Sequence, residues 1–156
     1  MNSGGAIRFE GARHEHTDIV LSMMRALEDA DPGATPFDEQ RRRTIWAEFV
    51  ADSSLGRAWI IWDGEQPIGY AVLTLGFSFE YRGRDAFLDE VYVDEKYRGR
   101  GIGRQAMEFV EAKAREMGVN AVHLVVTRQN KAAIELYRRA GYFPHERLLM
   151  TKRLAR

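Results

Sequence analysis

The stretch from Val91 to Arg104 constrains the fold of this chain more than any other. It reads VYVDEKYRGRGIGR, an apolar strand that runs into a glycine-rich turn and then into the start of a helix. Glycine permits positive φ and a close approach of backbone to ligand. The first amides of a helix have no internal partners, and with the helix dipole they form an anion site. We therefore expect a phosphate-binding strand–turn–helix unit, with Arg98, Arg100 and Arg104 adding positive charge.

Two familiar phosphate-binding patterns fit this turn poorly. A P-loop needs lysine and then serine or threonine after its last glycine, whereas Gly103 is followed by Arg104 and then glutamine. A dinucleotide-binding fingerprint has G-x-G-x-x-G spacing and an acidic residue at the end of the next strand. Gly99, Gly101 and Gly103 are spaced G-x-G-x-G, and the next expected strand, 121–127, contains no acidic residue.

A third pattern, R/Q-x-x-G-x-G/A, is matched in full by Arg98, Gly101 and Gly103. A second motif follows at 130–142, where NKAAIELYRRAGY is similar to N-x-x-A-x-x-x-Y-x-x-x-G-F, with Tyr142 in place of phenylalanine. The two motifs in this order resemble the coenzyme A motif and the following helix of the GCN5-related N-acetyltransferase (GNAT) superfamily. An arginine- and glycine-rich surface turn is the structural alternative for the first motif alone.

The hydrophobic pattern predicts strands followed by a strand–helix–strand arrangement in one domain, residues 1–156. The expected strands are 7–10, 58–62, 68–78, 86–93, 121–127 and 148–152. The expected helices are 17–29, one capped by Thr35 and running to about residue 51, 101–117 and 130–140. This order predicts an α/β (α+β) fold, a mixed sheet with helices on both faces. The resemblance adds that the sheet is mostly antiparallel and that its strands splay at the coenzyme A site.

Composition excludes several functions. Lysine plus arginine and aspartate plus glutamate number 23 each, so the chain lacks the basic excess of nucleic-acid or anionic-membrane binding. It has no cysteine, its four histidines lack metal-site spacing, and no apolar run could be a signal peptide or span a bilayer. We expect a soluble, cytoplasmic protein without a metal. We expect the three tryptophans in the core, and His123 as a satisfied core histidine or one that supports the site.

The resemblance implies acetyl-coenzyme A (acetyl-CoA) as co-substrate. In the superfamily the pantetheine arm lies between two splayed strands and pairs with the backbone of the fourth, here 87–93, and a backbone amide stabilises the oxyanion of direct acetyl transfer. The implied contacts with acetyl-CoA come from the end of this strand, the turn and the second motif: Val91, Tyr92, Val93, Arg98, Gly99, Arg100, Gly101, Ile102, Gly103, Arg104, Asn130 and Tyr137.

Two proton transfers need side chains. A substrate amine arrives largely protonated, so a base must take its proton, and Asp89 and Glu90 are the candidates. Strand alternation puts them on opposite faces, and we favour Glu90 slightly; the other would cap a turn or pair with an arginine. Tyr137 matches the superfamily's general acid for the departing thiolate, with a core aromatic as its alternative. Asn130 is expected to contact the pantetheine arm or to cap its helix.

The acceptor is less constrained. Glu80 and Tyr81 precede the strand that carries Asp89 and Glu90, and could reach the acceptor. The run GRDAFLDE at 83–90 is similar to the diamine N-acetyltransferase branch, although its acidic pair is reversed. The resemblance therefore favours a small polyamine or amino sugar as acceptor, ahead of protein lysine or N-terminal amines, and it allows a homodimer. A module that binds coenzyme A or an amine without turnover is the alternative from another class.

Overall fold

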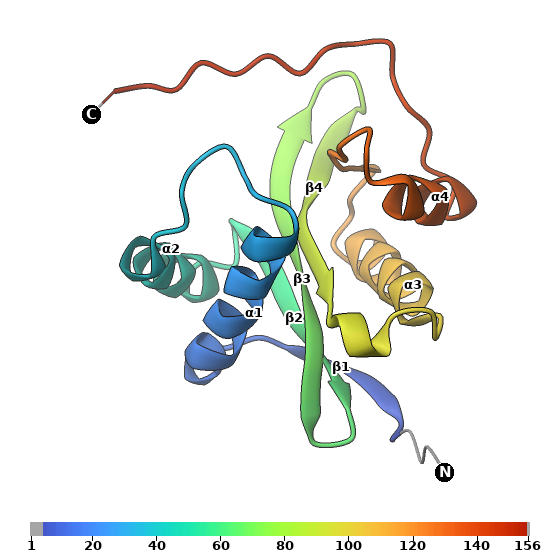
Figure 1. Cartoon of the computed structure of the whole chain (residues 1–156). Helices are drawn as coiled ribbons and strands as arrows, with labels where there is room; N and C mark the ends of the chain where they lie inside the picture. The colour runs from blue at the N-terminus through green and yellow to red at the C-terminus, as the bar shows by residue number, and fades with distance from the viewer. Residues whose placement is uncertain (1–4, 156) are drawn as a thin grey trace. The chain divides into compact units, whose positions relative to one another are not determined.

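The computed structural model describes residues 5–155. Its α-helices and β-strands are shown in Figure 1. The strands are β1 (Ile7–Gly11), β2 (Gly56–Asp63), β3 (Gln66–Ser78), β4 (Gly83–Val93) and β5 (Ala121–His123), and the helices are α1 (Thr17–Ala30), α2 (Glu39–Ala51), α3 (Ile102–Glu116) and α4 (Lys131–Arg139). The chain forms two compact units, one ending at Val125 and one beginning at Val126. The first contains the sheet and three of these helices, and the second contains α4.

The five strands lie in the order β1-β2-β3-β4-β5. The first three pairings are antiparallel, and β4 pairs with β5 in parallel. A hairpin turn near Asp63 and Gly64 joins β2 to β3, and Gly64 has the positive φ of 60° that such a turn requires. The expected mixed, mostly antiparallel sheet is confirmed.

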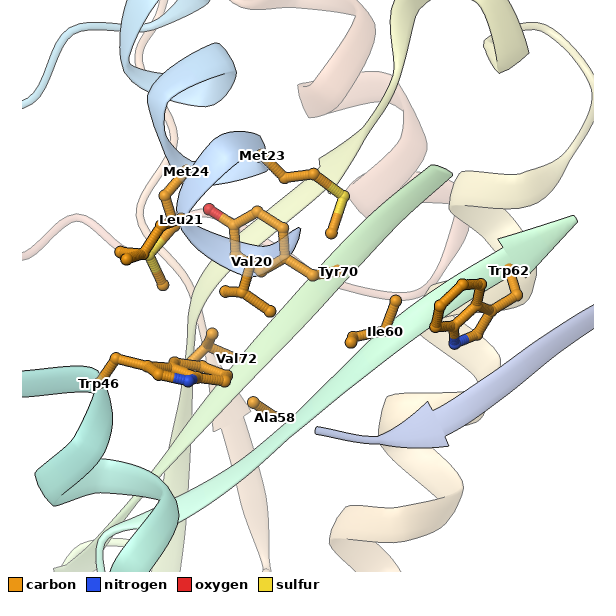
Figure 2. Close-up of a cluster of buried hydrophobic side chains, with 10 residues drawn as sticks. All are labelled: Val20, Leu21, Met23, Met24, Trp46, Ala58, Ile60, Trp62, Tyr70 and Val72. Carbon is orange, nitrogen blue, oxygen red and sulfur yellow. The ribbon is translucent and has the colours of Figure 1, made fainter. Parts of the chain in front are cut away.

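Alternate residues of the central strands pack under different helices. Ile60, Tyr70 and Val72 belong to a buried cluster with apolar residues of α1 and with Trp46 of α2 (Figure 2). On the other face, Ile61 packs with residues of α3, among them Ile102. The expectation of helices on both faces is confirmed within the first unit. All three tryptophans are buried, as expected.

The second helix begins later than predicted. The Asp38 carboxylate accepts a hydrogen bond from the Arg41 backbone N–H at 3.0 Å, so Asp38 and not Thr35 is the N-cap. Both residue types are good caps. The predicted cap Thr35 is therefore wrong, and the helix begins at Glu39, directly after Asp38.

Two of the predicted strands differ from the structure: one is shorter than predicted, and the other is not formed. The fifth ends at His123 and not at residue 127, because its ladder with β4 stops at the pair Phe87–His123. Residues 148–152 form no strand, and Leu148 and Met150 are exposed. Apolar and β-branched residues favour a strand only where a neighbour supplies backbone partners, and the described residues supply none to either segment.

Candidate active site

A β-bulge interrupts β4 at Asp89. Glu90 pairs with Val72 of β3, and Leu88 pairs with Leu73, so Asp89 is an extra residue with no partner of its own. Because Val72 and Leu73 are consecutive, Leu88 and Glu90 lie on opposite faces of the sheet although they are two residues apart. Simple alternation, from which we expected Asp89 and Glu90 on opposite faces, therefore does not hold here.

Both carboxylate oxygens of Glu90 are engaged by residues of other elements. Arg42 of α2 donates to Oε2 at 2.7 Å, and the hydroxyl of Tyr70 on β3 donates to Oε1 at 2.7 Å. The Glu90 side chain is only 16 % exposed. Burial, followed by the negative charge of Glu90, raises the pKa of Tyr70 well above its ordinary value, so its hydroxyl remains a donor. Glu90 is thus held as a structural carboxylate.

Asp89 has a different environment. It retains contact with solvent, and its side chain makes no hydrogen bond or ion pair with any of residues 5–155. Partial burial and, second, the charge of Glu90 raise the pKa of Asp89, and Arg42 offsets part of this rise. A carboxylate with a raised pKa and no engaged oxygen can accept a proton more readily than an ordinary aspartate.

The edge of β4 that faces β5 is open beside this bulge. Parallel pairing covers Asp85 to Phe87 only, and in the described part of the chain no strand pairs with that edge from Leu88 to Val93. The backbone N–H and C=O groups that this edge presents therefore have no partner strand and are available to a ligand, except that the Val93 carbonyl accepts a hydrogen bond from Arg98. The ladder between β4 and β5 ends at the pair Phe87–His123, and the expected contacts Val91, Tyr92 and Val93 belong to the part of β4 beyond that pair.

The glycine-rich turn follows β4 and ends in the first residue of α3. Gly101 caps the helix with φ 76° and ψ 10°, and Gly99 also has φ 76°. These left-handed conformations explain two of the glycines. A Cβ placed on either would have no neighbour within 4 Å, so space above the backbone is open. The turn therefore leads with unobstructed backbone into the positive end of a helix dipole, as the sequence predicted.

The three arginines of the turn differ in their contacts. Arg98 Nε donates to the Val93 carbonyl at 3.0 Å and so closes the turn. Arg100 lies 3.5 Å from the Asp63 carboxylate and over the ring of Tyr97. Arg104 is exposed and pairs with glutamate one helical turn on, at 3.0 Å. All three keep positive charge near the turn, but each already has a protein partner.

The second motif lies in the second unit. The Asn130 side chain accepts a hydrogen bond from the Ala133 N–H at 3.2 Å and caps α4, one of its two expected roles. Tyr137 lies on α4, is partly buried, and its ring is 6.1 Å from that of Tyr142. Gly141 follows the helix with φ 94°, which explains the glycine of the motif.

The remaining candidates lie at the paired end of β4 and β5. Glu80 and Tyr81 are in the turn between β3 and β4, and the Tyr81 ring is 4.8 Å from the ring of His123. His123 Nε2 is 3.2 Å from the Asp85 carboxylate, so it is a satisfied, half-buried histidine, as expected. A side chain on Gly76 would meet Asp85 at 2.7 Å, which shows that this glycine makes room for the pair.

The sequence did not point to Arg42 or Tyr70. Arg42 lies 48 residues before Glu90 and Tyr70 lies 20 residues before it. Arg42 belongs to a run of three arginines in which nothing local distinguishes it, and Tyr70 is one of two aromatic residues on an apolar strand. The three-dimensional packing of α2 and β3 against the bulge selects them.

No group of three or more histidine, aspartate or glutamate residues in the described ranges could hold a metal, and no described helix is long and apolar enough to cross a membrane.

Comparison with known families gives one match over most of the chain. The family model described as "Acetyltransferase (GNAT) family" matches residues 20–142. This span includes the bulge, the open edge, the turn and the second motif.

Individual proteins similar to this chain include curated N-acetyltransferases, which match part of its sequence, and a solved structure, which shares its fold. Thialysine N-epsilon-acetyltransferase of Bos taurus is 34% identical over 74 residues, 47% of this chain and 43% of that protein. A D-amino-acid N-acetyltransferase of Saccharomyces cerevisiae is 29% identical over 98 residues, 63% of this chain and 55% of that protein. The chain thus spans about half the length of these relatives. The crystal structure of an integron cassette protein from a salt-marsh metagenome has a TM-score of 0.81 and 30% identity, covering 95% of this chain and 91% of that one.

Proposed function

The chain belongs to the acetyltransferase (GNAT) family, and from that premise we propose that it moves an acetyl group from acetyl-CoA directly to a primary amine of a small molecule. The observation that carries this proposal is the open edge of β4 beside the bulge at Asp89. An extended backbone with unused hydrogen-bonding groups lies there next to a carboxylate with no protein partner. Direct transfer gains most of its rate from such positioning.

The residues present fit acetyl-CoA. The amides that follow Gly101 and the positive end of α3 suit its pyrophosphate, and the open Leu88–Val93 edge suits its pantetheine arm. When bound, acetyl-CoA supplies the activated acetyl thioester. The chain binds and orients it, and a free N–H of the β4 edge would polarise the acetyl carbonyl.

Asp89 is the residue that we propose as the base. The acceptor resembles a lysine side chain, with a pKa of about 10, and reaches the site mostly protonated. Glu90 was the slightly favoured candidate from the sequence, but its two oxygens are occupied by Arg42 and Tyr70. The free carboxylate and raised pKa of Asp89 support it instead, acting directly or through a water.

Tyr137 is the residue that we propose to protonate the departing thiolate. A thiol with a pKa of about 8.5 leaves as a fair anion, so the help of an acid is useful but not essential. Its position in the second motif and its partial burial support this role. Asn130 then serves by capping α4 and so fixing the helix that carries Tyr137.

The acceptor that we propose is a small cationic amine, with polyamines and amino sugars as the first classes to test. The uncompensated carboxylate of Asp89 at the bulge, together with the acidic Glu80 in the turn between β3 and β4, supports a cation. The relatives named above act, by their names, on thialysine and on D-amino acids, which are also small primary amines.

Calorimetric titration of the purified protein with acetyl-CoA, with NAD as the control, tests the cofactor assignment. Binding of acetyl-CoA at micromolar or lower Kd without binding of NAD is the expected result. Binding of neither nucleotide would contradict the proposal. Acetyl-CoA binding together with no thiol release for any amine of a panel would favour a module without turnover.

A further inference from the structure

Arg42 places a positive charge of the protein itself beside the carboxylates where an acceptor amine is proposed to bind. Its guanidinium donates to Glu90 at 2.7 Å, and its side chain is 30 % exposed, so it lies at the edge of the bulge and not deep in the core. It reaches this place from α2, an element otherwise remote in sequence from β4. Nothing in the proposed chemistry requires a cation at this point.

The side chain of Arg42 is held in place by contacts on two sides. On one side its guanidinium lies 5.7 Å from the ring of Phe37, and Arg25 of α1 lies 4.4 Å from the same ring. On the other side Tyr70, which is fully buried, holds the carboxylate that Arg42 contacts. The connection between α1 and α2 is thereby fixed beside the Glu90 ion pair.

The charges at the bulge can be counted. Asp89 and Glu90 carry one negative charge each and Arg42 carries one positive charge, which leaves one uncompensated negative charge, that of Asp89. Glu28 of α1 also faces Arg42, but both of its oxygens lie 3.2 Å from the Gly33 N–H. Without Arg42 the bulge would present two uncompensated negative charges side by side, that of Asp89 and that of Glu90, whose Oε1 still accepts from the Tyr70 hydroxyl. Such a pair of charges suits two ammonium groups.

We propose that Arg42 is a specificity-determining residue that limits the bulge to one ammonium group of the acceptor. The inference rests on the proposed function and refines it: the wild-type site takes the reacting amine at Asp89, and any further ammonium of the acceptor must be held elsewhere. Arg42 acts by occupying Glu90, and it need not touch the acceptor. The positive charge of Arg42 selects among acceptors because it compensates the charge of Glu90 and repels a second ammonium group, and not because it adds a contact with the acceptor.

Two acceptors of equal chain length test this directly, diaminobutane and butylamine, which differ by one ammonium group. The readout is the ratio of their kcat/KM values. Arg42→Gln should raise the ratio in favour of diaminobutane about tenfold, the size of one desolvated charge contact. Arg42→Lys keeps the charge and should retain the wild-type ratio. Arg42→Gln combined with Glu90→Gln restores one net negative charge and should return the ratio towards wild type.

Arg43→Gln is the matched control. Arg43 is the next residue of α2, and it pairs with Asp18 at 2.9 Å, away from the bulge. The same charge is removed from the same helix, and the ratio should not change. An unchanged ratio in Arg42→Gln, or an equal change in Arg43→Gln, would overturn the inference.

Calorimetry separates this inference from the proposed function. If no amine is turned over, the proposed function fails, but the binding of diaminobutane and butylamine to the coenzyme A complex still measures the charge preference. A ratio of Kd values that shifts in Arg42→Gln and not in Arg43→Gln supports the role of Arg42. A ratio that stays the same in both variants contradicts it. Glu90→Gln, which leaves Arg42 uncompensated, should shift the ratio the opposite way and serves if Arg42→Gln does not fold.

Discussion

The bulge of β4 and the glycine-rich turn that follows it are two regions of one site built in different ways. At the bulge, Glu90 is fixed by side chains from α2 and β3 that are far away in the sequence. At the turn, the proposed anion site consists of backbone: left-handed Gly101 and the first amides of α3. A site made of backbone is visible as a local motif, whereas a site made of a side-chain network depends on the whole fold. The two regions should therefore fail in different ways when they are mutated.

The largest effect is expected from Asp89→Asn. If Asp89 is the base, its loss should lower kcat/KM about a thousandfold, within the range for general-base residues, and leave the affinity for acetyl-CoA unchanged. Steady-state kinetics and calorimetry measure the two quantities. A variant that keeps its rate, or that loses acetyl-CoA binding instead, would contradict the division between bulge and turn.

The same variant makes a separate prediction on stability. Because folding raises the pKa of Asp89, the fold favours the protonated form, and that stabilisation is present at low pH and lost as pH rises through the folded pKa. Asparagine cannot ionise. Asp89→Asn should therefore have a higher Tm than wild type at neutral pH, and the difference should disappear below about pH 3, where the wild-type carboxyl is protonated in both states. A lower Tm at neutral pH would show that Asp89 stabilises the fold through a contact.

Tyr137→Phe is expected to have the next largest effect. Loss of the proposed acid should lower kcat about a hundredfold with little change in the Kd for acetyl-CoA. The pH–rate profile distinguishes chemistry from packing, because loss of an acid should remove the fall in rate on the alkaline side. Equal rates in the two proteins at every pH would make Tyr137 a structural residue of α4.

Gly101→Ala should weaken acetyl-CoA binding about tenfold, because a Cβ would strain the left-handed conformation, at about 1–2 kcal/mol, and intrude on the approach of the pyrophosphate. Gly118→Ala is the matched control, since Gly118 follows the other end of α3 with φ 74° and equally open space. The two variants should lose similar stability in urea unfolding, but only Gly101→Ala should lose affinity. Equal affinities would refute the anion site at the turn.

Tyr70→Phe should have the smallest effect on activity. It removes the donor to Glu90 Oε1 from a fully buried position and should cost about 1–2 kcal/mol of unfolding free energy. Arg42 still holds the carboxylate, so kcat/KM should fall less than about threefold. A large loss of activity with little loss of stability would mean that Glu90, and not Asp89, takes part in proton transfer.

The sequence predicted the parts of this molecule that are determined locally. Gly101 and Asn130 lie where their motifs placed them, and both have the predicted local role. The order of strands and helices correctly predicted helices on both faces of the sheet, where Ile60 and Ile61 pack on opposite sides. These features depend on the local backbone conformation and on the order of local elements, both of which are determined by residues close together in the sequence.

The remaining features depend on partners that local pattern does not specify. The bulge at Asp89 exists only in the register between β3 and β4, so simple alternation could not describe this part of the strand. Arg42 becomes a site residue only when α2 packs on the sheet. The strand predicted at 148–152 had suitable residues but finds no partner strand among those described. Each of these outcomes is decided by long-range contacts.

The central claim is that the chain moves acetyl groups to amines, and detection of the product tests it most directly. The purified protein would be incubated with acetyl-CoA and a panel of small amines, and acetylated amine would be measured by mass spectrometry beside the thiol released. The account predicts an N-acetylated amine formed in equal amount to free coenzyme A. Release of thiol without acetylated amine, or tight binding of acetyl-CoA with no product from any amine, would contradict it.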